Sequence, residues 1–242
     1  VGARPGVGKT TFCMNIAANI GKAYKDGDVA IFSLEMSKES LVNRMLSAEA
    51  NVDNYTIRRA SFSTPEWEAI TMACSTLSNT RIYIDDTPST TTTDMKAKLR
   101  RLDNPKIVII DYLQLMNASG MKFGSREQEV SMISRSLKQL AKELNIPIIA
   151  LSQLNRSVEN RGTDGQSKRP QLSDLRESGA IEQDADSVMF LYRDEYYNPN
   201  TQDKNIAECI VAKNRHGETG TVKLQWRPQF FTFSDLEWKH EG

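Results

Sequence analysis

The chain has 242 residues, of which 39% are hydrophobic, and its 31 lysines and arginines balance 31 aspartates and glutamates. This length suits one α/β domain with a sizeable core, and the zero net charge argues against a protein that coats duplex DNA by bulk attraction. Three distant cysteines without CxxC spacing argue against a zinc site or a disulfide framework, and no apolar run reaches the roughly 18 residues of a membrane span. A soluble, cytoplasmic protein is expected.

The first motif is ARPGVGKT, residues 3–10, which fits the pattern GxxxxGK[ST] except that Ala3 replaces the first glycine. Gly6 and Gly8 allow backbone N–H groups to surround phosphate oxygens, Lys9 supplies positive charge, and Thr10 can ligate Mg²⁺ at the start of a helix. The alternative is a glycine turn with an incidental lysine. The expected nucleotide site consists of Ala3, Arg4, Pro5, Gly6, Val7, Gly8, Lys9, Thr10 and Thr11.

Only Val1 and Gly2 precede this loop, although a phosphate loop normally follows a buried strand. We therefore expect the chain, residues 1–242, to be a fragment that begins within or just after the first core strand.

Short apolar runs rich in β-branched residues recur along the chain and predict strands at 29–34, 81–85, 106–111, 146–152, 187–192 and 207–212. Most are apolar on consecutive residues, which is typical of strands buried on both faces of a largely parallel sheet. Between them three helices are predicted, each with one apolar face. The first begins at Thr64-Pro65, and the third begins with a capping box from Ser125 to Gln128. Their apolar faces are, in chain order, Trp67, Ile70, Cys74 and Leu77; Met95, Leu99 and Leu102; and Val130, Ile133, Leu137, Leu140 and Leu144. Alternating strands and helices predict an α/β fold with a mainly parallel sheet.

Residues 205–235 contain two β-like runs joined by a glycine-containing turn, followed by QFFTF, and predict an antiparallel hairpin that extends the sheet. Residues 117–124 and 155–171 are polar and unpatterned, so they are predicted to be loops. A loop as long as the second is either disordered or functional in a compact domain.

Three polar residues end predicted strands: Glu35 after VAIFSL, Asp111 in KIVIID and Gln153 after IPIIALS. Ligands of open α/β sheets bind at the carboxyl ends of strands, and Asp111 has the arrangement of a Walker B carboxylate that holds Mg²⁺. Glu35 can accept a proton from the attacking water, and Gln153 can sense the γ-phosphate or orient that water. Singly, Asp111 could instead cap a strand end, Glu35 could cap a helix near Ser37, and Gln153 could belong to a loop.

Lys213 and Arg215, in AKNRHG, are two residues apart and would point to the same side of a strand. No obvious anion for them precedes in the chain, which suggests a phosphate supplied by another subunit, as for an arginine finger. An ordinary surface pair is the alternative.

Five ordered segments resemble the C-terminal ATPase domain of DnaB-type replicative DNA helicases: SLEMS (33–37), IDYLQLM (110–116), ALSQLNRSVE (150–159), the long segment at 169–197 and AKNRHGETG (212–220). The family commonly carries alanine where Ala3 stands. The resemblance implies a RecA-like P-loop fold, a homo-hexameric ring, and ATP-driven travel along single-stranded DNA with duplex unwinding.

The resemblance also implies roles for particular residues. Lys9 and Thr10 would bind phosphate and Mg²⁺, Glu35 would activate water, Asp111 would hold the metal, and Gln153 would couple the γ-phosphate to the adjoining loop. Arg44, on the helix after Glu35, would couple hydrolysis to movement, and Lys213 and Arg215 would reach the neighbouring subunit's site.

The implied DNA-contacting segment is LRESG, with Arg176, Glu177 and Gly179. Arg176 can meet a phosphate and Gly179 can expose a backbone N–H to another, which tracks a strand without reading its bases. A helix-capping turn is the competing interpretation. Weaker candidates for residues that face the central channel of the implied ring are Lys122, Arg126, Lys168 and Arg169.

A primase and a helicase loader would bind through other parts of the parent protein. The rival hypotheses are another RecA-like ATPase, such as a recombinase or a KaiC-like regulator, and a non-catalytic nucleotide-binding assembly module.

Overall fold

The computed structural model describes residues 1–118, 123–159, 161 and 168–236. Its strands are β1 (Gly2–Ala3), β2 (Asp28–Ser33), β3 (Arg81–Asp85), β4 (Pro105–Asp111), β5 (Ile148–Ala150), β6 (Ser152–Gln153), β7 (Ser187–Tyr192), β8 (Ile206–Asn214), β9 (Gly220–Arg227) and β10 (Thr232–Asp235). Its α-helices are α1 (Lys9–Ala23), α2 (Lys38–Ala50), α3 (Asn54–Arg59), α4 (Thr64–Ser78), α5 (Thr92–Leu99), α6 (Arg126–Leu144), α7 (Gly179–Asp184) and α8 (Asp194–Tyr197). Short 3₁₀ helices are η1 (Leu113–Leu115), η2 (Arg156–Val158), η4 (Leu172–Ser178) and η5 (Pro228–Phe230).

The strands form two sheets that share one chain segment. One sheet has the order β3-β2-β4-β5 and is parallel, and the other has the order β10-β9-β8-β7-β1-β6. Strands β5 and β6 follow each other across Leu151, so this segment pairs with β4 in one sheet and with β1 in the other. The result is a mainly parallel α/β fold of the RecA-like P-loop type, as predicted.

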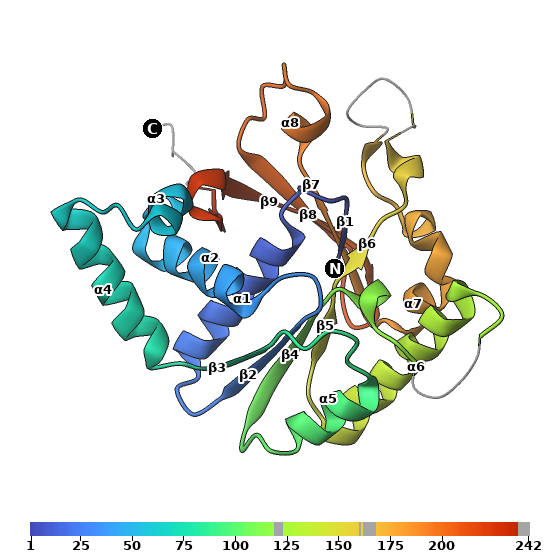
Figure 1. The fold of residues 1–242 in the computed structure, drawn as a ribbon. Helices are drawn as coiled ribbons and strands as arrows, with labels where there is room; N and C mark the ends of the chain where they lie inside the picture. Colours follow the sequence, from blue (N-terminus) through green and yellow to red (C-terminus); the bar gives the residue numbers. More distant parts are fainter. Residues whose placement is uncertain (119–122, 160, 162–167, 237–242) are drawn as a thin grey trace.

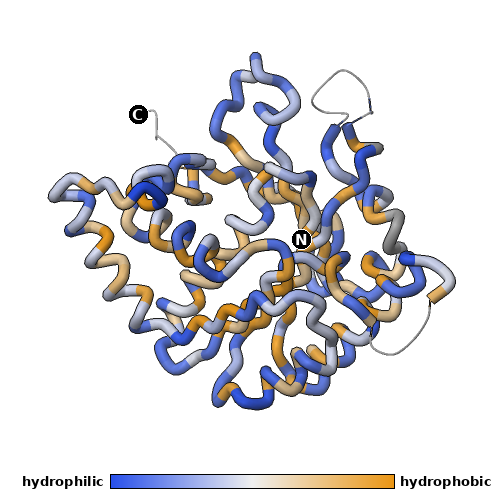
Figure 2. Tube along the Cα trace, viewed as in Figure 1, coloured by the Kyte–Doolittle hydropathy of each residue, from blue (hydrophilic) through white to orange (hydrophobic). Residues whose placement is uncertain are grey.

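Helices cover both sides of the central strands (Figure 1). On one side Val29 and Ile31 of β2 pack with residues of α1 and α2, whereas Ala30 and Phe32 of the same strand pack with α5 and α6 on the other. Successive side chains of a strand point to opposite faces, so an uninterrupted apolar run supplies both cores. Figure 2 shows hydrophobic residues concentrated along the central strands and polar residues over the outer surface.

The predicted helices are present, but the predicted apolar face of α4 is only half right: Ile70 is buried and Leu77 packs partly buried against the core, whereas the other two members are exposed. Ile70 and Ala73 are buried, whereas Trp67 is 59% exposed and Cys74 is also exposed. The helix α4 lies at the margin of the molecule and packs mainly on α2 (Figure 1). Because only one neighbouring helix covers most of its contact surface, only a narrow stripe of its side chains is buried. By contrast, α6 buries its predicted stripe, and its N-cap Ser125 accepts a hydrogen bond from the backbone N–H of Gln128, which is one half of the predicted capping box. The Gln128 side chain accepts from Gly124 N and not from Ser125 N.

The predicted C-terminal hairpin is confirmed: β8 and β9 pair antiparallel, and β10 adds a third antiparallel strand. Of the two predicted loops, residues 119–122, 160 and 162–167 lie outside the described part, while η2 forms within the second. Among the helices that the structure describes, none is both long and apolar enough to cross a membrane.

Candidate nucleotide-binding site

The phosphate loop connects β1 to α1 through two glycines with positive φ. Gly6 has φ 77° and Gly8 has φ 115°, a backbone conformation that favours glycine. Gly8 is also the N-cap of α1, a helix of 15 residues, and has no side chain that could cap its first turn. The N–H groups of that turn and the positive end of the helix dipole therefore form a site for an anion, as the motif predicts.

Lys9, Thr10 and Asp111 converge at the start of α1. The Thr10 hydroxyl donates a hydrogen bond of 2.6 Å to Oδ2 of Asp111, and the Lys9 Nζ lies 4.7 Å from the centre of the Tyr112 ring. Burial lowers the pKa of Lys9, while the carboxylates of Asp111 and Glu35 raise it. Two carboxylates thus act on the lysine that the motif assigns to phosphate.

Asp111 is fully buried at the end of β4. Burial raises its pKa, and this is opposed first by the Thr10 hydrogen bond and then by the charges of Lys9 and Arg44. Its Oδ1 is buried and has no hydrogen-bond partner within the described residues. A buried carboxylate oxygen beside a threonine hydroxyl is the donor set that suits a hard cation such as Mg²⁺.

Glu35 and Arg44 lie on the side of the site formed by the β2–α2 connection. The N-cap of α2 is Ser37, whose side chain accepts from Ser40 N, so the alternative that Glu35 caps this helix is wrong. Burial lowers the pKa of Arg44, whereas the charges of Asp111 and Glu35 raise it, so both carboxylates act on this arginine. The Arg44 guanidinium also lies 4.8 Å from the centre of the Phe231 ring.

Gln153 lies beside the first residue of the phosphate loop, because β6 pairs in register with β1 at Ala3. Sequence reasoning missed its partner, Gln114 of η1. Gln114 donates to Ser152 Oγ at 2.8 Å and to the Gln153 carbonyl at 3.2 Å, and it accepts from Gln153 N at 3.3 Å. It thereby joins the strand of Asp111 to the strand of Gln153. Its place three residues after Asp111 in IDYLQLM was the available signal.

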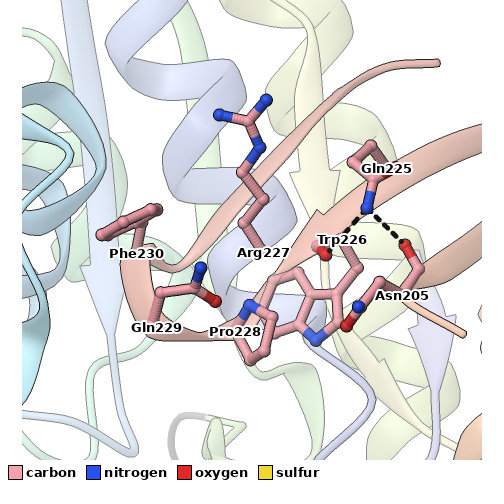
Figure 3. Close-up of a pocket in the computed structure, with 7 residues that line it drawn as sticks. All are labelled: Asn205, Gln225, Trp226, Arg227, Pro228, Gln229 and Phe230. Atoms are coloured by element: carbon pink, nitrogen blue, oxygen red, sulfur yellow. Dashed lines mark hydrogen bonds between the residues drawn. The ribbon is translucent and has the colours of Figure 1, made fainter. Parts of the chain in front are cut away.

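The C-terminal hairpin packs against the phosphate loop, which sequence reasoning also missed. A Cβ atom added to Gly8 would lie 2.8 Å from Cζ of Phe233, and Asn15 of α1 accepts from Phe233 N at 2.8 Å. Trp226 packs on Phe233 with ring centres 4.5 Å apart. Trp226 also lines a cavity of about 360 Å³, shown in Figure 3, whose lining residues are Asn205, Gln225, Trp226, Arg227, Pro228, Gln229 and Phe230.

Lys213 and Arg215 lie away from this chain's own phosphate loop. Lys213 pairs with Val188 near the start of β7, whereas β1 pairs further along β7 at Phe190 and continues from there into the loop. The Lys213 ammonium donates to the carbonyls of Glu182 and Ala185 at 2.6 and 2.8 Å, and Arg215 donates to the Gln183 carbonyl at 2.7 Å. Arg215 lies in the turn after β8 and not on the strand where the prediction placed it, yet both side chains contact carbonyls of residues 182–185. The expectation that no anion for them precedes in the chain is wrong for Arg215, whose Nη1 pairs with Oδ1 of Asp186 at 3.4 Å. The carboxyl end of α7 supplies the carbonyl acceptors of Lys213.

Comparison with known proteins decides the family. The family model described as "DnaB-like helicase C terminal domain" matches residues 1–235. The chain belongs to this DnaB-like family. It is 53% identical over 240 residues to "Replicative DNA helicase DnaB" of Geobacillus stearothermophilus, and 52% identical to "Replicative DNA helicase DnaC" of Bacillus subtilis. Each match covers 98% of this chain and 52% of the relative, so the chain spans about half the length of these relatives.

Solved structures of similar proteins share the fold. One of them, the structure of an ATPase domain, matches with a TM-score of 0.91 and 41% identity, over 98% of this chain and 83% of that one. Another, named "The Structure Of A DnaB-Like Replicative Helicase And Its Interactions With Primase", gives the same TM-score and identity over 98% of this chain and 56% of that one.

The LRESG segment of this DnaB-like domain lies in η4 and the start of α7. The side chains of Arg176 and Glu177 lie outside the described part of the structure. Gly179 has a right-handed helical backbone, with φ −50°, and a Cβ there would have nothing within 4 Å. Neither backbone strain nor crowding therefore requires glycine at this position.

Three weaker channel candidates have contacts within the DnaB-like domain, and the fourth, Lys122, lies outside the described residues. Arg126 donates to the Met116 carbonyl at 3.0 Å and pairs with Glu129. Arg169 pairs with the buried Glu208, and Lys168 lies 5.7 Å from the centre of the Tyr197 ring. These contacts give each of the three an intramolecular role.

Proposed function

We propose that this domain is the motor of a replicative DNA helicase, which couples ATP hydrolysis to movement along single-stranded DNA and to unwinding of the duplex. The observation that carries the proposal is the Thr10–Asp111 hydrogen bond beside Lys9, with Glu35 acting on the same lysine, in a chain of the DnaB-like family. Separation of the duplex costs roughly 1.4 kcal/mol of stacking per base-pair step, so a motor of this kind must spend hydrolysis on movement.

The donor set fits Mg²⁺. Thr10 Oγ1 and the Asp111 carboxylate, with its buried Oδ1, would hold the ion, and the ion when bound would offset negative charge on the phosphates. Backbone N–H groups of residues 6–9 and the Lys9 ammonium would bind phosphate oxygens. Glu35 would accept the proton of the attacking water. Gln153 would contact the γ-phosphate and so couple its presence or absence to the position of the residues that follow β6.

Glu35→Gln tests the role of general base, because the amide keeps the shape and loses the ability to accept the proton. The expected result is loss of ATP hydrolysis with nucleotide binding retained, measured by phosphate release and by fluorescent nucleotide titration. Glu39→Gln is the matched control, since Glu39 is exposed in the first turn of α2. Hydrolysis that survives in Glu35→Gln would remove this residue from the role.

We infer a homo-hexamer in which Lys213 and Arg215 serve a neighbouring copy. Their place supports this, since Lys213 pairs near the start of β7, whereas the phosphate loop follows β1, which pairs further along that strand. An arginine finger contributes on the order of 10³ to 10⁵ in rate. Arg215→Ala subunits mixed with Lys9→Ala subunits should regain some active interfaces, whereas no recovery at any mixing ratio would contradict the arrangement.

Single-stranded DNA is the proposed track, with Arg176 and Gly179 as contacts. The exposed Gly179, which no local strain demands, supports backbone approach to a phosphate. Arg176→Ala should weaken binding of an oligonucleotide and reduce the slope of log affinity against log salt by about 0.7 for each phosphate that is no longer bound. Arg101→Ala, at an exposed position after α5, is the control. An unchanged slope would place Arg176 away from the backbone.

The decisive experiment is strand displacement by the full-length parent protein. ATP-dependent unwinding is expected; DNA-stimulated ATPase without unwinding would favour another RecA-like ATPase. We propose a cytoplasmic protein whose parent also binds a helicase loader and a primase, as the name of one similar structure states of primase for that helicase.

A further inference from the structure

Arg4 is the second residue of the phosphate loop, and its side chain is engaged outside the loop. It is only 7% exposed. Its Nε donates to Oε1 of Glu159 at 2.7 Å, and its Nη1 donates to the Leu154 carbonyl at 2.7 Å. A guanidinium can hold a carboxylate and a backbone carbonyl at once because its donors form a rigid, planar fork. Arg4 therefore attaches the phosphate loop to residues 154–159.

Residues 154–159 continue directly from Gln153. Leu154 N donates to the Ala3 carbonyl at 3.2 Å, so backbone and side chain both join this segment to the start of the loop. Its apolar residues, Leu154 and Val158, are 2% and 0% exposed and pack in one cluster with Leu175 of η4. Leu175 immediately precedes Arg176, the proposed DNA contact.

A polar connection runs beside this apolar one. Asn155 N donates to the Asp174 carbonyl at 3.5 Å, and Arg161 forms an ion pair with the Asp174 carboxylate. Asp174 is 5% exposed and accepts from Gln171 N at 2.7 Å at the start of η4. In Figure 1 the yellow segment after β6 lies next to the orange segment that leads into α7. The η4 helix is thus fixed to the same segment that Arg4 holds.

We propose that Arg4 is a positioning residue that couples the phosphate loop to the LRESG segment, through Glu159 and Leu154 to Leu175 and Asp174. Phosphate binding would change the position of the loop backbone, which includes Arg4. Because the Arg4 side chain is bonded to Glu159 and Leu154, residues 154–159 would shift with it. This inference rests on the proposed function, since it needs both nucleotide and DNA to bind. It assigns Arg4 a task different from contacting phosphate.

The test measures how much single-stranded DNA changes nucleotide affinity in the full-length parent. A fluorescent non-hydrolysable ATP analogue is titrated with and without a poly-dT oligonucleotide, and the ratio of the two Kd values is the coupling factor, which is reciprocal for the two ligands. Residues along such a connection change coupling on the order of 2- to 30-fold. Arg4→Gln should lower the coupling factor by that amount.

Three further variants sharpen the test. Glu159→Gln should lose part of the coupling that Arg4→Gln loses, because the Arg4 bond to the Leu154 carbonyl remains. The double variant should lose no more than Arg4→Gln, because Arg4→Gln already removes both bonds. Arg4→Lys should restore part of the coupling. Arg100→Gln is the matched control, since it breaks an ion pair with Glu143 of 2.9 Å outside this connection and should leave the coupling factor unchanged.

Each alternative outcome has a distinct meaning. A large rise in the nucleotide Kd of Arg4→Gln with the coupling factor intact would make Arg4 a phosphate ligand and overturn the proposal. Unchanged coupling in Glu159→Gln would overturn it too, and this variant decides the matter if Arg4→Gln fails to fold, because Glu159 lies outside the loop. If the wild-type protein itself shows no coupling between nucleotide and DNA, the proposed function fails, which is distinguishable from loss confined to this connection.

Discussion

Gly8→Ala should destabilise the nucleotide-free protein more than Gly6→Ala does, because of the C-terminal hairpin. Both glycines have positive φ, so alanine at either position costs ~1–2 kcal/mol of backbone strain. At Gly6 the added Cβ would meet Tyr196 Cε2 at 3.4 Å, an ordinary contact, whereas at Gly8 it would meet Phe233 Cζ at 2.8 Å. Phe233 cannot easily retreat, since it packs on Trp226 and Phe12. Overpacking of this kind adds about 1–3 kcal/mol.

Urea unfolding followed by circular dichroism measures both free energies without nucleotide, and each kcal/mol should also lower Tm by roughly 2–4 °C. Phe233→Leu in both backgrounds completes the cycle: removal of the ring should shrink the excess cost of Gly8→Ala over Gly6→Ala. The reasoning fails if Gly8→Ala costs no more than Gly6→Ala, or if the excess persists in the Phe233→Leu background.

Three other predictions concern charge, thiols and a helix end. Burial raises the pKa of Asp111 above its ordinary value of 3.8. The contribution of Asp111 to stability is therefore fullest below that pH and is lost as the pH rises through the native pKa. Urea titrations should show that the stability of wild type relative to Asp111→Asn falls from about pH 4 upward, and a rise would contradict this. Of the three thiols, the exposed Cys74 should react rapidly with Ellman's reagent at pH 8. Cys13 should react slowly, because burial raises the pKa of Cys13 to about 12. Cys74→Ser should abolish the fast phase, and a surviving fast phase would refute the assignment. Lys213→Met should lower the free energy of unfolding by about 1 kcal/mol, because it removes the hydrogen bonds from the ammonium to carbonyls at the end of α7. Lys223→Met, at an exposed position, is the control and should leave the free energy of unfolding unchanged. Equal effects of the two variants would argue against a specific role of Lys213 at α7.

The sequence by itself determined the elements and the local chemistry of the phosphate loop. A run such as VAIFS is apolar on nearly every residue because β2 supplies side chains to two cores, and the glycines and lysine of ARPGVGKT have roles that depend on backbone conformation within a few residues. The strand-end positions of Glu35, Asp111 and Gln153 were also readable, because parallel strands end at one edge of a sheet.

Only the tertiary structure decided which distant residues complete the site and which face of each marginal element is covered. Periodicity placed Trp67 in a buried face of α4, but burial depends on how many layers lie beyond a helix, and no described element covers the outer side of this one. The acceptors of Lys213, the packing of Phe233 on Gly8 and the contacts of Arg4 with residues 154–159 join positions tens to hundreds of residues apart. No local pattern encodes such contacts, because they follow from the order in which strands pair, and that order brings both the hairpin and the segment after β6 against the same phosphate loop.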